Sequence, residues 1–324
     1  MKAAIVEQFG TAPRYADVET PLARDGLVVA DVAAASVKNL DRGLVSGQHY
    51  GSSALKPPFV PGTDGVARLS DGALVYAQAN GSTGFMAEQT VVDPTRAVPV
   101  PAGLDPVRAA AIPNPGLSAW LSLEVTAQVQ PGARILVLGA TGVTGAVAVQ
   151  LAKRTFGAKS VVAVGRNAER LQWLRTRGAD DVLVLGTGAL TSAVTEMHAA
   201  DPFDIVLDYL WGTPAEQTLT ALGGRGLRTS FHSTRYVQVG SMAGPDITLP
   251  AGILRSAGIE LVGFGIGSVP AEALGRARTQ VLPALFDMVS DGTLDIAVQE
   301  RALADVTQVW DAPEPAGHRT VLVP

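Results

Sequence analysis

The chain has 324 residues, 47% of them hydrophobic and 17% charged, with a formal net charge of -5. This length exceeds that of most single domains, so we expect two globular domains. The acidic balance gives no basic footprint for nucleic acid or an anionic membrane. The absence of cysteine excludes disulfides, thiolate nucleophiles and cysteine-based zinc sites. Because the N-terminal segment reaches Glu7 before a signal-peptide apolar core forms, we expect a cytoplasmic location.

The first third of the chain is rich in Pro and Gly and carries short strand-like runs. These runs are residues 3–6, 26–37, 65–69, 73–76 and 89–92. The proline-spaced residues 98–101 then lead into a helical segment at 104–111, which suits a domain boundary. We therefore expect a β-rich first domain.

From about residue 114, apolar strands alternate with helical segments. The expected strands are residues 134–138, 160–164, 181–185, 203–207, 236–239 and 259–264. Parallel strands need crossover connections, usually helices, so this pattern predicts an α/β domain with a doubly wound parallel sheet, the Rossmann fold. A helical run at 271–289 and a last strand at 320–323 are expected to return to the first domain. The predicted domains are residues 1–113 with 267–324, and residues 114–266.

A glycine-rich turn, Gly139-Ala140-Thr141-Gly142-Val143-Thr144-Gly145, follows the first of these strands. Glycines let the backbone approach a pyrophosphate closely, and the first N–H groups of the next helix point at the phosphate oxygens. Glycines also form ordinary turns and caps, so the position after the strand is what favours a dinucleotide site. The predicted cofactor residues of this turn are Gly139, Thr141, Gly142, Val143 and Thr144.

The end of the second expected strand indicates which dinucleotide binds. An NAD site normally places Asp or Glu there, about 20 residues after the glycines. Here the sequence is Val164-Gly165-Arg166-Asn167, and Arg170 follows one helical turn later. Without a carboxylate to repel a phosphate, the site favours the 2′-phosphate of NADP(H). The predicted contacts are Gly165, Arg166, Asn167 and Arg170, unless both arginines are only solvated.

Motifs over nearly the whole length carry a family resemblance. They are Pro61-Gly62-Thr63-Asp64-Gly65, the turn at 139–145 with residues 149–153, Gly178-Ala179-Asp180, and residues 203–208 and 317–322. With these motifs the chain resembles the zinc-independent quinone oxidoreductase branch of the medium-chain dehydrogenase/reductase superfamily. The resemblance implies a chaperonin-10-like (GroES-like) first domain, the cofactor in the cleft between the domains, and a homodimer in many members. It also implies hydride transfer from NADPH to quinones or activated alkenes.

The chain departs from the zinc-containing members of that superfamily. They carry Gly-His-Glu where this chain has Gly62-Thr63-Asp64, and a cysteine ligand near residues 37–39. The family's C-terminal Gly-Lys is here Gly317-His318-Arg319, which leaves the role of that lysine open. No metal-ligand spacing relates the four dispersed histidines, His49, His198, His232 and His318. We therefore expect no metal and four surface or hydrogen-bonded histidines.

Without a metal Lewis acid the substrate must supply its own activation, as conjugation does in a quinone or an α,β-unsaturated carbonyl compound. The protein then needs hydrogen-bond donors near the developing oxyanion. The resemblance places Asn39 near the nicotinamide, where it could also donate to substrate. Lys38 is a candidate for stabilising an enolate, or a solvated strand-end lysine, and Asp41 is expected to order the loop. Tyr50 lies near the place where enoyl reductases of the superfamily carry a proton-donating tyrosine, so the resemblance implies a candidate proton donor; the alternative is a packing aromatic.

Further cofactor contacts are expected where the later parallel strands end, because ligands gather at those carboxyl ends. These predicted residues are Asp208, Tyr209, Gly240, Ser241, Gly263, Phe264 and Gly265. The resemblance implies that the last two segments hold the nicotinamide half through backbone groups. Ordinary glycine turns after strands would look the same.

Three hypotheses about function follow. The first is an NADPH-dependent oxidoreductase that transfers hydride to a quinone or α,β-unsaturated carbonyl compound without zinc. The second is an enoyl-thioester reductase acting on acyl-carrier substrates. The third is a non-catalytic NADPH-binding sensor or structural protein, since a fold does not guarantee activity. The expected partners are a small-molecule substrate and a second copy of the chain, and neither nucleic acid nor membrane.

Overall fold

The computed structural model describes residues 1–223 and 231–324. The chain divides into two compact units: unit 1 is Met1–Asn114 with Arg278–Pro324, and unit 2 is Pro115–Ala277. Within the described ranges, no helix is long and apolar enough to cross a membrane.

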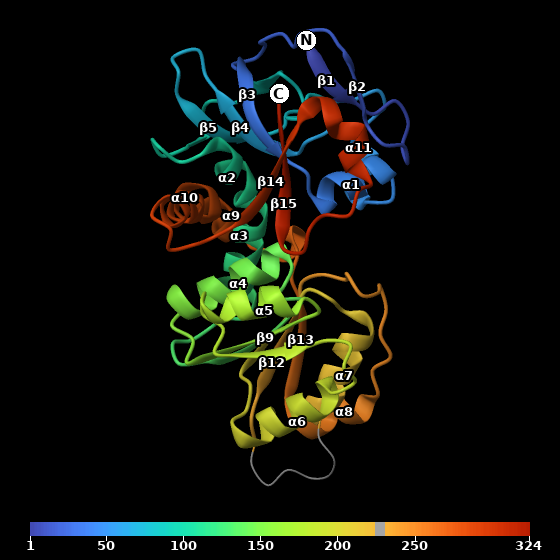
Figure 1. The fold of residues 1–324 in the computed structure, drawn as a ribbon, viewed down its shortest axis with the longest axis vertical. Helices are drawn as coiled ribbons and strands as arrows, with labels where there is room; N and C mark the ends of the chain where they lie inside the picture. Colours follow the sequence, from blue (N-terminus) through green and yellow to red (C-terminus); the bar gives the residue numbers. More distant parts are fainter. Residues whose placement is uncertain (224–230) are drawn as a thin grey trace. The chain divides into compact units, whose positions relative to one another are not determined.

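Unit 2 is built on a parallel sheet of six strands (Figure 1). In spatial order the strands are β10 (Asp181–Val184), β9 (Ser160–Gly165), β8 (Arg134–Leu138), β11 (Ile205–Asp208), β12 (Thr234–Gln238) and β13 (Ile259–Gly263). Numbered along the chain this order is 3-2-1-4-5-6, so the predicted Rossmann domain is confirmed. The order reverses between β8 and β11, and ligands of such sheets bind at the carboxyl ends beside this switch point.

Helices cover both faces of this sheet (Figure 1). α4 (Val143–Arg154) and α5 (Ala168–Arg175) lie on one face, and α6 (Leu190–Ala200), α7 (Gly212–Gly223) and α8 (Ala251–Ala257) lie on the other. Because β8 is covered on both faces, all five of its residues are buried. The other helical segments are α3 (Pro113–Leu121), the π-helical turn η2 (Ser122–Thr126), the 3₁₀ turn η3 (Ile266–Ser268) and α9 (Ala271–Arg276).

Unit 1 is rich in strands, as predicted. A small antiparallel sheet pairs β1 (Lys2–Ile5) with β2 (Arg14–Asp17). The larger sheet has the order β14 (Ala297–Ala302), β15 (His318–Val323), β3 (Val28–Ser36), β4 (Asp64–Arg68), β5 (Leu74–Gln78) and β7 (Val98–Pro99), and β6 (Gln89–Val92) also pairs with β3. The pairing of β15 with β3 confirms that the last strand returns to the first part of the chain.

Short helices surround the sheets of unit 1 (Figure 1). They are α1 (Asn39–Ser46), η1 (Tyr50–Ala54), α2 (Pro106–Ala111), the π-helical turn η4 (Ala277–Val281), α10 (Leu282–Ser290), η5 (Leu303–Asp305) and α11 (Val306–Trp310). The β-rich unit and the parallel-sheet unit together confirm the predicted fold class.

The second passage of the chain between the units falls after Ala277, whereas we expected the Rossmann domain to end at residue 266. The physical reason is a small apolar cluster in which Val269, Ala273 and Ala277 pack with Leu121. This cluster keeps residues 267–277 in unit 2. The functional domain boundaries, 113/114 and 266/267, stay a prediction.

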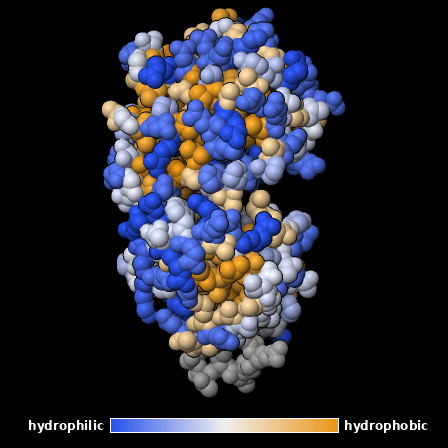
Figure 2. Space-filling view, viewed as in Figure 1, coloured by the Kyte–Doolittle hydropathy of each residue, from blue (hydrophilic) through white to orange (hydrophobic). Residues whose placement is uncertain are grey.

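Each unit has an apolar core of its own. Val6, Phe85 and Trp310 belong to the main core of unit 1, and Leu136 and Tyr236 belong to that of unit 2. Hydrophilic residues cover most of the face drawn in Figure 2, and apolar colouring is confined to patches. On this face the units show the usual separation of an apolar interior from a mostly polar surface.

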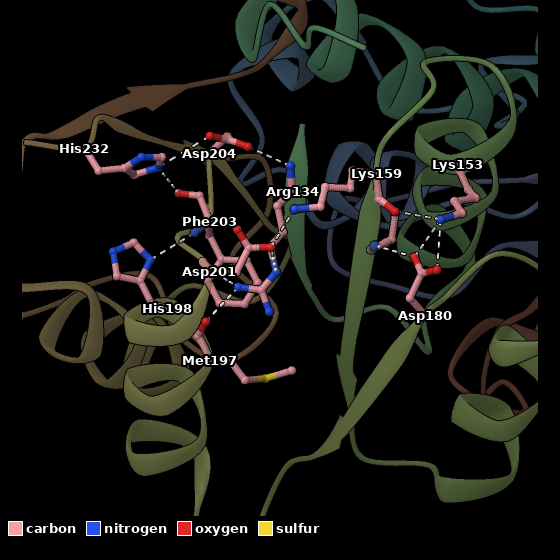
Figure 3. Close-up of polar contacts among 11 residues, drawn as sticks. Arg134, Lys153, Lys159, Asp180, Met197, His198, Asp201, Phe203, Asp204 and His232 are labelled. Carbon is pink, nitrogen blue, oxygen red and sulfur yellow. Dashed lines mark hydrogen bonds and ion pairs between the residues drawn. The ribbon is translucent and has the colours of Figure 1, made fainter. Parts of the chain in front are cut away.

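Charged side chains connect the amino ends of the parallel strands with the C-terminal end of α6 (Figure 3). Arg134, the first residue of β8, donates to the carbonyl oxygens of Met197, at 2.7 Å, and Asp201. Its guanidinium also lies over the ring of Phe203, 4.2 Å from the centroid. A cation is favourable at the carbonyl end of a helix. This edge of the sheet is thus held by structural contacts.

The histidines have hydrogen-bond partners, as predicted. At the amino edge of the sheet, His198 accepts the Phe203 N–H at 3.1 Å through Nδ1, and His232 Nε2 lies 3.0 Å from the Phe203 carbonyl oxygen (Figure 3). In unit 1, His49 Nδ1 accepts the Gly51 N–H at 3.0 Å, and His318 Nδ1 lies 3.1 Å from the Ala316 carbonyl oxygen.

Candidate cofactor and active site

The glycine turn lies at the switch point of the unit 2 sheet. Gly139 leaves β8 with a φ of +80°, and its N–H and that of Ala140 both donate to the Val164 carbonyl oxygen at 2.9 Å. A Cβ on Gly145 would stand 2.4 Å from the Gly139 carbonyl oxygen and 2.8 Å from Ala140 Cα. Only glycine therefore lets α4 start so close to the turn. The first N–H groups of a helix have no partner within it, so those of α4 are available to an anion.

The end of β9 packs against the same turn. A Cβ on Gly165 would lie 2.4 Å from Cγ2 and 2.6 Å from Oγ1 of Thr141, so a side chain at position 165 would displace that threonine. Gly165 and Thr141 are thus brought together, as the predicted site requires. The next residue, Arg166, is exposed.

The segment after β9 leads into α5, and two of its arginines have contacts with residues of this helix. Asn167 caps this helix by accepting the Arg170 N–H at 2.9 Å, so its side-chain oxygen already has a structural role. The guanidinium carbons of Arg170 and Arg177 lie 4.0 Å and 5.6 Å from the centroid of the Trp173 ring. Sequence reasoning missed Trp173 and Arg177. The spacing of three residues between Arg170 and Trp173, which places both side chains on one face of α5, was the available signal, whereas Arg177 lies beyond the end of this helix.

Asp208, the last residue of β11, accepts three hydrogen bonds. Its Oδ1 accepts the N–H groups of Leu210 and Trp211 at 2.7 and 3.0 Å, and its Oδ2 accepts the Tyr236 hydroxyl at 2.7 Å. Burial raises the pKa of this carboxyl, although the backbone donors and the tyrosine oppose that shift. Asp208 therefore frames the carboxyl edge of the sheet through contacts inside unit 2. The predicted neighbour Tyr209 is also buried.

Of the other predicted cofactor residues, Gly240, Ser241 and Gly263 lie at this carboxyl edge. A Cβ on Gly240 would lie 2.8 Å from the Tyr209 carbonyl oxygen, so glycine allows the end of β12 to approach that of β11. Beside them a groove of about 410 Å³ is lined by residues that include Trp211, Ser241 and Gly263. Gly265 is exposed, and Phe264 packs against the apolar cluster around Leu121.

Trp211 was also missed by sequence reasoning. Its φ of +57° lies in the left-handed region, which non-glycine residues seldom adopt. The hydrogen bond from its N–H to Asp208 holds this conformation. A larger groove, of about 510 Å³, lies at the amino ends of the strands, where Arg235 and Glu260 pair at 2.6 Å. Ligands of parallel sheets bind at the opposite ends, so we assign this groove no part in cofactor binding.

The predicted catalytic residues belong to unit 1 and have different environments. Asn39 is the exposed first residue of α1. Tyr50 begins η1, is 80% exposed, and has its ring centroid 4.0 Å from that of His49. Both side chains are accessible, and their roles in catalysis stay predictions.

Lys38 is buried, so the alternative of a solvated strand-end lysine is wrong. Its ammonium lies 3.0 Å from Asp64 Oδ1 and 3.2 Å from Asp41 Oδ2, and it donates to the Ser36 carbonyl oxygen at 3.2 Å. These partners use the donors of the ammonium, so the contacts favour a structural role over direct contact with substrate.

Asp41 orders the loop, as predicted, because it accepts the N–H groups of Lys38 and Thr63 at 3.0 and 2.9 Å. In the segments 37–39 and 62–64, where the resemblance places different residues in the zinc-containing members, this chain has the ion pair of Lys38 with Asp64. Within residues 1–223 and 231–324, no group of three or more His, Cys, Asp or Glu side chains could hold a metal ion. Zinc independence stays a prediction.

The sheet order and the glycine turn at its switch point define a dinucleotide-binding α/β protein. Residues 143–279 match the family model described as zinc-binding dehydrogenase. The crystal structure of the quinone oxidoreductase from Thermus thermophilus, also solved with NADPH, is 26% identical, with a TM-score of 0.80 and full coverage of both chains. The chain belongs to the medium-chain dehydrogenase/reductase superfamily, in its quinone oxidoreductase branch.

Curated relatives agree with this placement. The "Probable NADPH-dependent quinone reductase tdiC" of Emericella nidulans is 26% identical over 90% of this chain and 91% of its own length. "Prostaglandin reductase-3" of Bos taurus is 28% identical over 74% of this chain, which spans 64% of the bovine protein. The predicted family is thus confirmed.

Proposed function

We propose that the protein is an NADPH-dependent oxidoreductase that reduces a quinone or an α,β-unsaturated carbonyl compound without zinc. The observation that carries the choice of NADPH is the end of β9. Gly165 there adjoins the glycine turn, the exposed Arg166 follows it directly, and Arg170 comes one helical turn later in α5. Relatives named as quinone and prostaglandin reductases support the proposed substrate classes.

The residues present fit the cofactor. The turn at Gly139, Thr141, Gly142, Val143 and Thr144 would hold the pyrophosphate at the first N–H groups of α4, because the lack of a Cβ on Gly145 lets this helix begin directly against the turn. Gly165, Arg166, Asn167 and Arg170 would hold the adenosine end with its 2′-phosphate. The edge framed by Asp208 and Tyr209, with Gly240, Ser241, Gly263, Phe264 and Gly265, would hold the nicotinamide end. When bound, NADPH supplies the hydride.

The chain's own contribution is binding, orientation and hydrogen bonding. Asn39 would donate to the substrate oxygen on which negative charge develops, and such donors act most strongly where water is excluded. Tyr50 would supply the proton that completes the reduction. The Tyr50→Phe variant tests this role, since it keeps the ring and removes the proton.

Loss of NADPH absorbance with a panel of quinones, enones and enoyl thioesters tests the activity. We expect turnover of quinones or enones. Tight NADPH binding without turnover of any compound would favour the non-catalytic alternative, and turnover of thioesters alone would favour the enoyl-thioester reductase.

The Arg166→Ala variant tests the cofactor assignment. Removing a charge-assisted hydrogen bond costs about 1.5–3 kcal/mol, so we expect the Kd for NADPH to rise about tenfold or more while that for NADH changes little. Arg175→Ala is the matched control, because Arg175 is the last residue of α5, the helix that follows Arg166, and pairs with Asp181 at 2.7 Å. Equal losses for NADPH and NADH in Arg166→Ala would contradict the assignment.

A homodimer and a cytoplasmic location are further parts of the proposal. β13 is an edge strand of the unit 2 sheet, and its Leu261 and Val262 are only partly buried. Edge strands offer unpaired backbone groups, so a second copy could extend the sheet there. The mass in solution by light scattering tests the dimer, and cell fractionation tests the location.

A further inference from the structure

A buried ion cluster lies at the start of α1. The Lys38 side chain is 1% exposed, that of Asp41 is fully buried, and that of Asp64 is 11% exposed. The ammonium lies within 3.2 Å of a carboxylate oxygen of each aspartate. Burial alone would lower the pKa of Lys38, but Asp41 and Asp64 outweigh it and hold the pKa above its ordinary value. The lysine is therefore charged in the folded protein.

The cluster joins main-chain segments that are distant in the sequence. Asp41, in the first turn of α1, accepts the Thr63 N–H just before β4, and Lys38 reaches back to Ser36 at the end of β3. Arg319 of β15, itself 6% exposed, donates to the Val37 carbonyl oxygen at 3.0 Å. Three strands thus converge on the backbone that leads into Asn39.

Such a cluster is not explained by stability alone. Taking ions out of water is costly, and replacing a buried ion pair with apolar residues of similar volume is often neutral or stabilising. What ions and directional hydrogen bonds add is a single geometry. The next residue after Lys38 is the exposed Asn39, so that geometry is imposed on a side chain of the candidate active site.

We propose that Lys38, Asp41 and Asp64 are positioning residues that fix the start of α1 and so the direction in which Asn39 presents its amide to substrate. This inference rests on the proposed function. A misplacement of a catalytic group by about 1 Å costs an enzyme up to about a hundredfold in rate. We therefore expect a loosened cluster to lower kcat even in a variant that still folds.

The test variant is Lys38→Met with Asp64→Asn, which removes one positive and one negative charge and so keeps the net charge of the cluster. We expect kcat to fall at least about tenfold, with the Kd for NADPH within about twofold of wild type, because the contacts assigned to the pyrophosphate and the adenosine end are in unit 2. The control is Arg108→Met, which removes an ion pair to Asp295 elsewhere in unit 1 and should leave kcat unchanged. An unchanged kcat in the double variant, or an equal loss in the control, overturns the proposal.

Chemical rescue separates the ammonium from simple space filling. In Lys38→Ala, added propylammonium should restore kcat several-fold and saturably, and propanol should not. Equal rescue by propanol would show that volume matters and charge does not, which overturns the role of the ion.

Hydrogen exchange keeps the inference separate from the proposed function. If the wild type reduces none of the panel, the proposed function fails, and exchange at residues 38–42 and 63–64 decides the positioning claim. We expect exchange there at least about tenfold faster in the double variant than in Arg108→Met. Equal rates overturn the claim whatever the activity.

Discussion

Gly145 shows how one residue without a side chain shapes the cofactor site. A Cβ at this position would stand 2.4 Å from the Gly139 carbonyl oxygen, too close to fit without moving the turn. We therefore expect Gly145→Val to raise the Kd for NADPH at least about a hundredfold and to lower the melting temperature, measured by calorimetry and scanning fluorimetry. The control is Gly252→Ala in α8, where a Cβ meets no atom within 4 Å. Unchanged NADPH binding in Gly145→Val would count against the turn as the phosphate site.

The ion pairs of Lys38 with Asp41 and Asp64 determine the sign of the pH dependence that we expect for unit 1. Its folded pKa is raised above the ordinary value of 10.5, so the stability that its charge contributes is present below about pH 10.5 and is lost as the pH rises through the folded pKa. We expect the free energy of unfolding of the wild type to fall more steeply above pH 10.5 than that of Lys38→Met, measured by urea unfolding. Parallel profiles would show that the buried ammonium carries none of this loss.

At the scale of elements, Asp208 joins β11 to β12. Asp208→Leu leaves two backbone N–H groups and the Tyr236 hydroxyl without their acceptor, so we expect a loss of about 3 kcal/mol in urea unfolding. Asp208→Asn is the control, because its oxygen can accept both N–H groups and its amide can donate to Tyr236, and we expect a loss below about 1 kcal/mol. Similar losses in both variants would show that the charge, and not the hydrogen bonding, matters.

The strands that sequence reasoning missed have weak hydrophobic patterns. β2 (Arg14–Asp17) has no fully buried residue, and β14 (Ala297–Ala302) is at the edge of its sheet with three exposed residues. Strands such as β8 were predicted because burial on both faces requires a continuous apolar run. Strands were thus predicted correctly where burial requires apolar residues, and they were missed where only the pairing with a neighbouring strand defines them.

At the scale of the whole molecule, we expect cofactor binding to raise the free energy of unfolding. A ligand at about a hundred times its Kd adds about 2.7 kcal/mol to the free energy of unfolding. We expect adenosine 2′,5′-bisphosphate, the end of NADPH assigned to Arg166 and Arg170, to raise the melting temperature more than adenosine 5′-monophosphate at equal concentration. Equal shifts would show that the protein does not recognise the 2′-phosphate.

The sequence by itself determined the two fold types, the glycine turn at the switch point and the absence of a carboxylate after β9, because each is encoded in neighbouring residues. Only the tertiary structure decided what Lys38 and Asp208 do. Their partners Asp64 and Tyr236 lie 26 and 28 residues away in the chain, and strand pairing brings them together. In the sequence, a lysine or aspartate at the end of a strand looks the same whether its side chain is solvated or buried. Burial beside a charged or hydrogen-bonding partner gives Lys38 and Asp208 their structural roles.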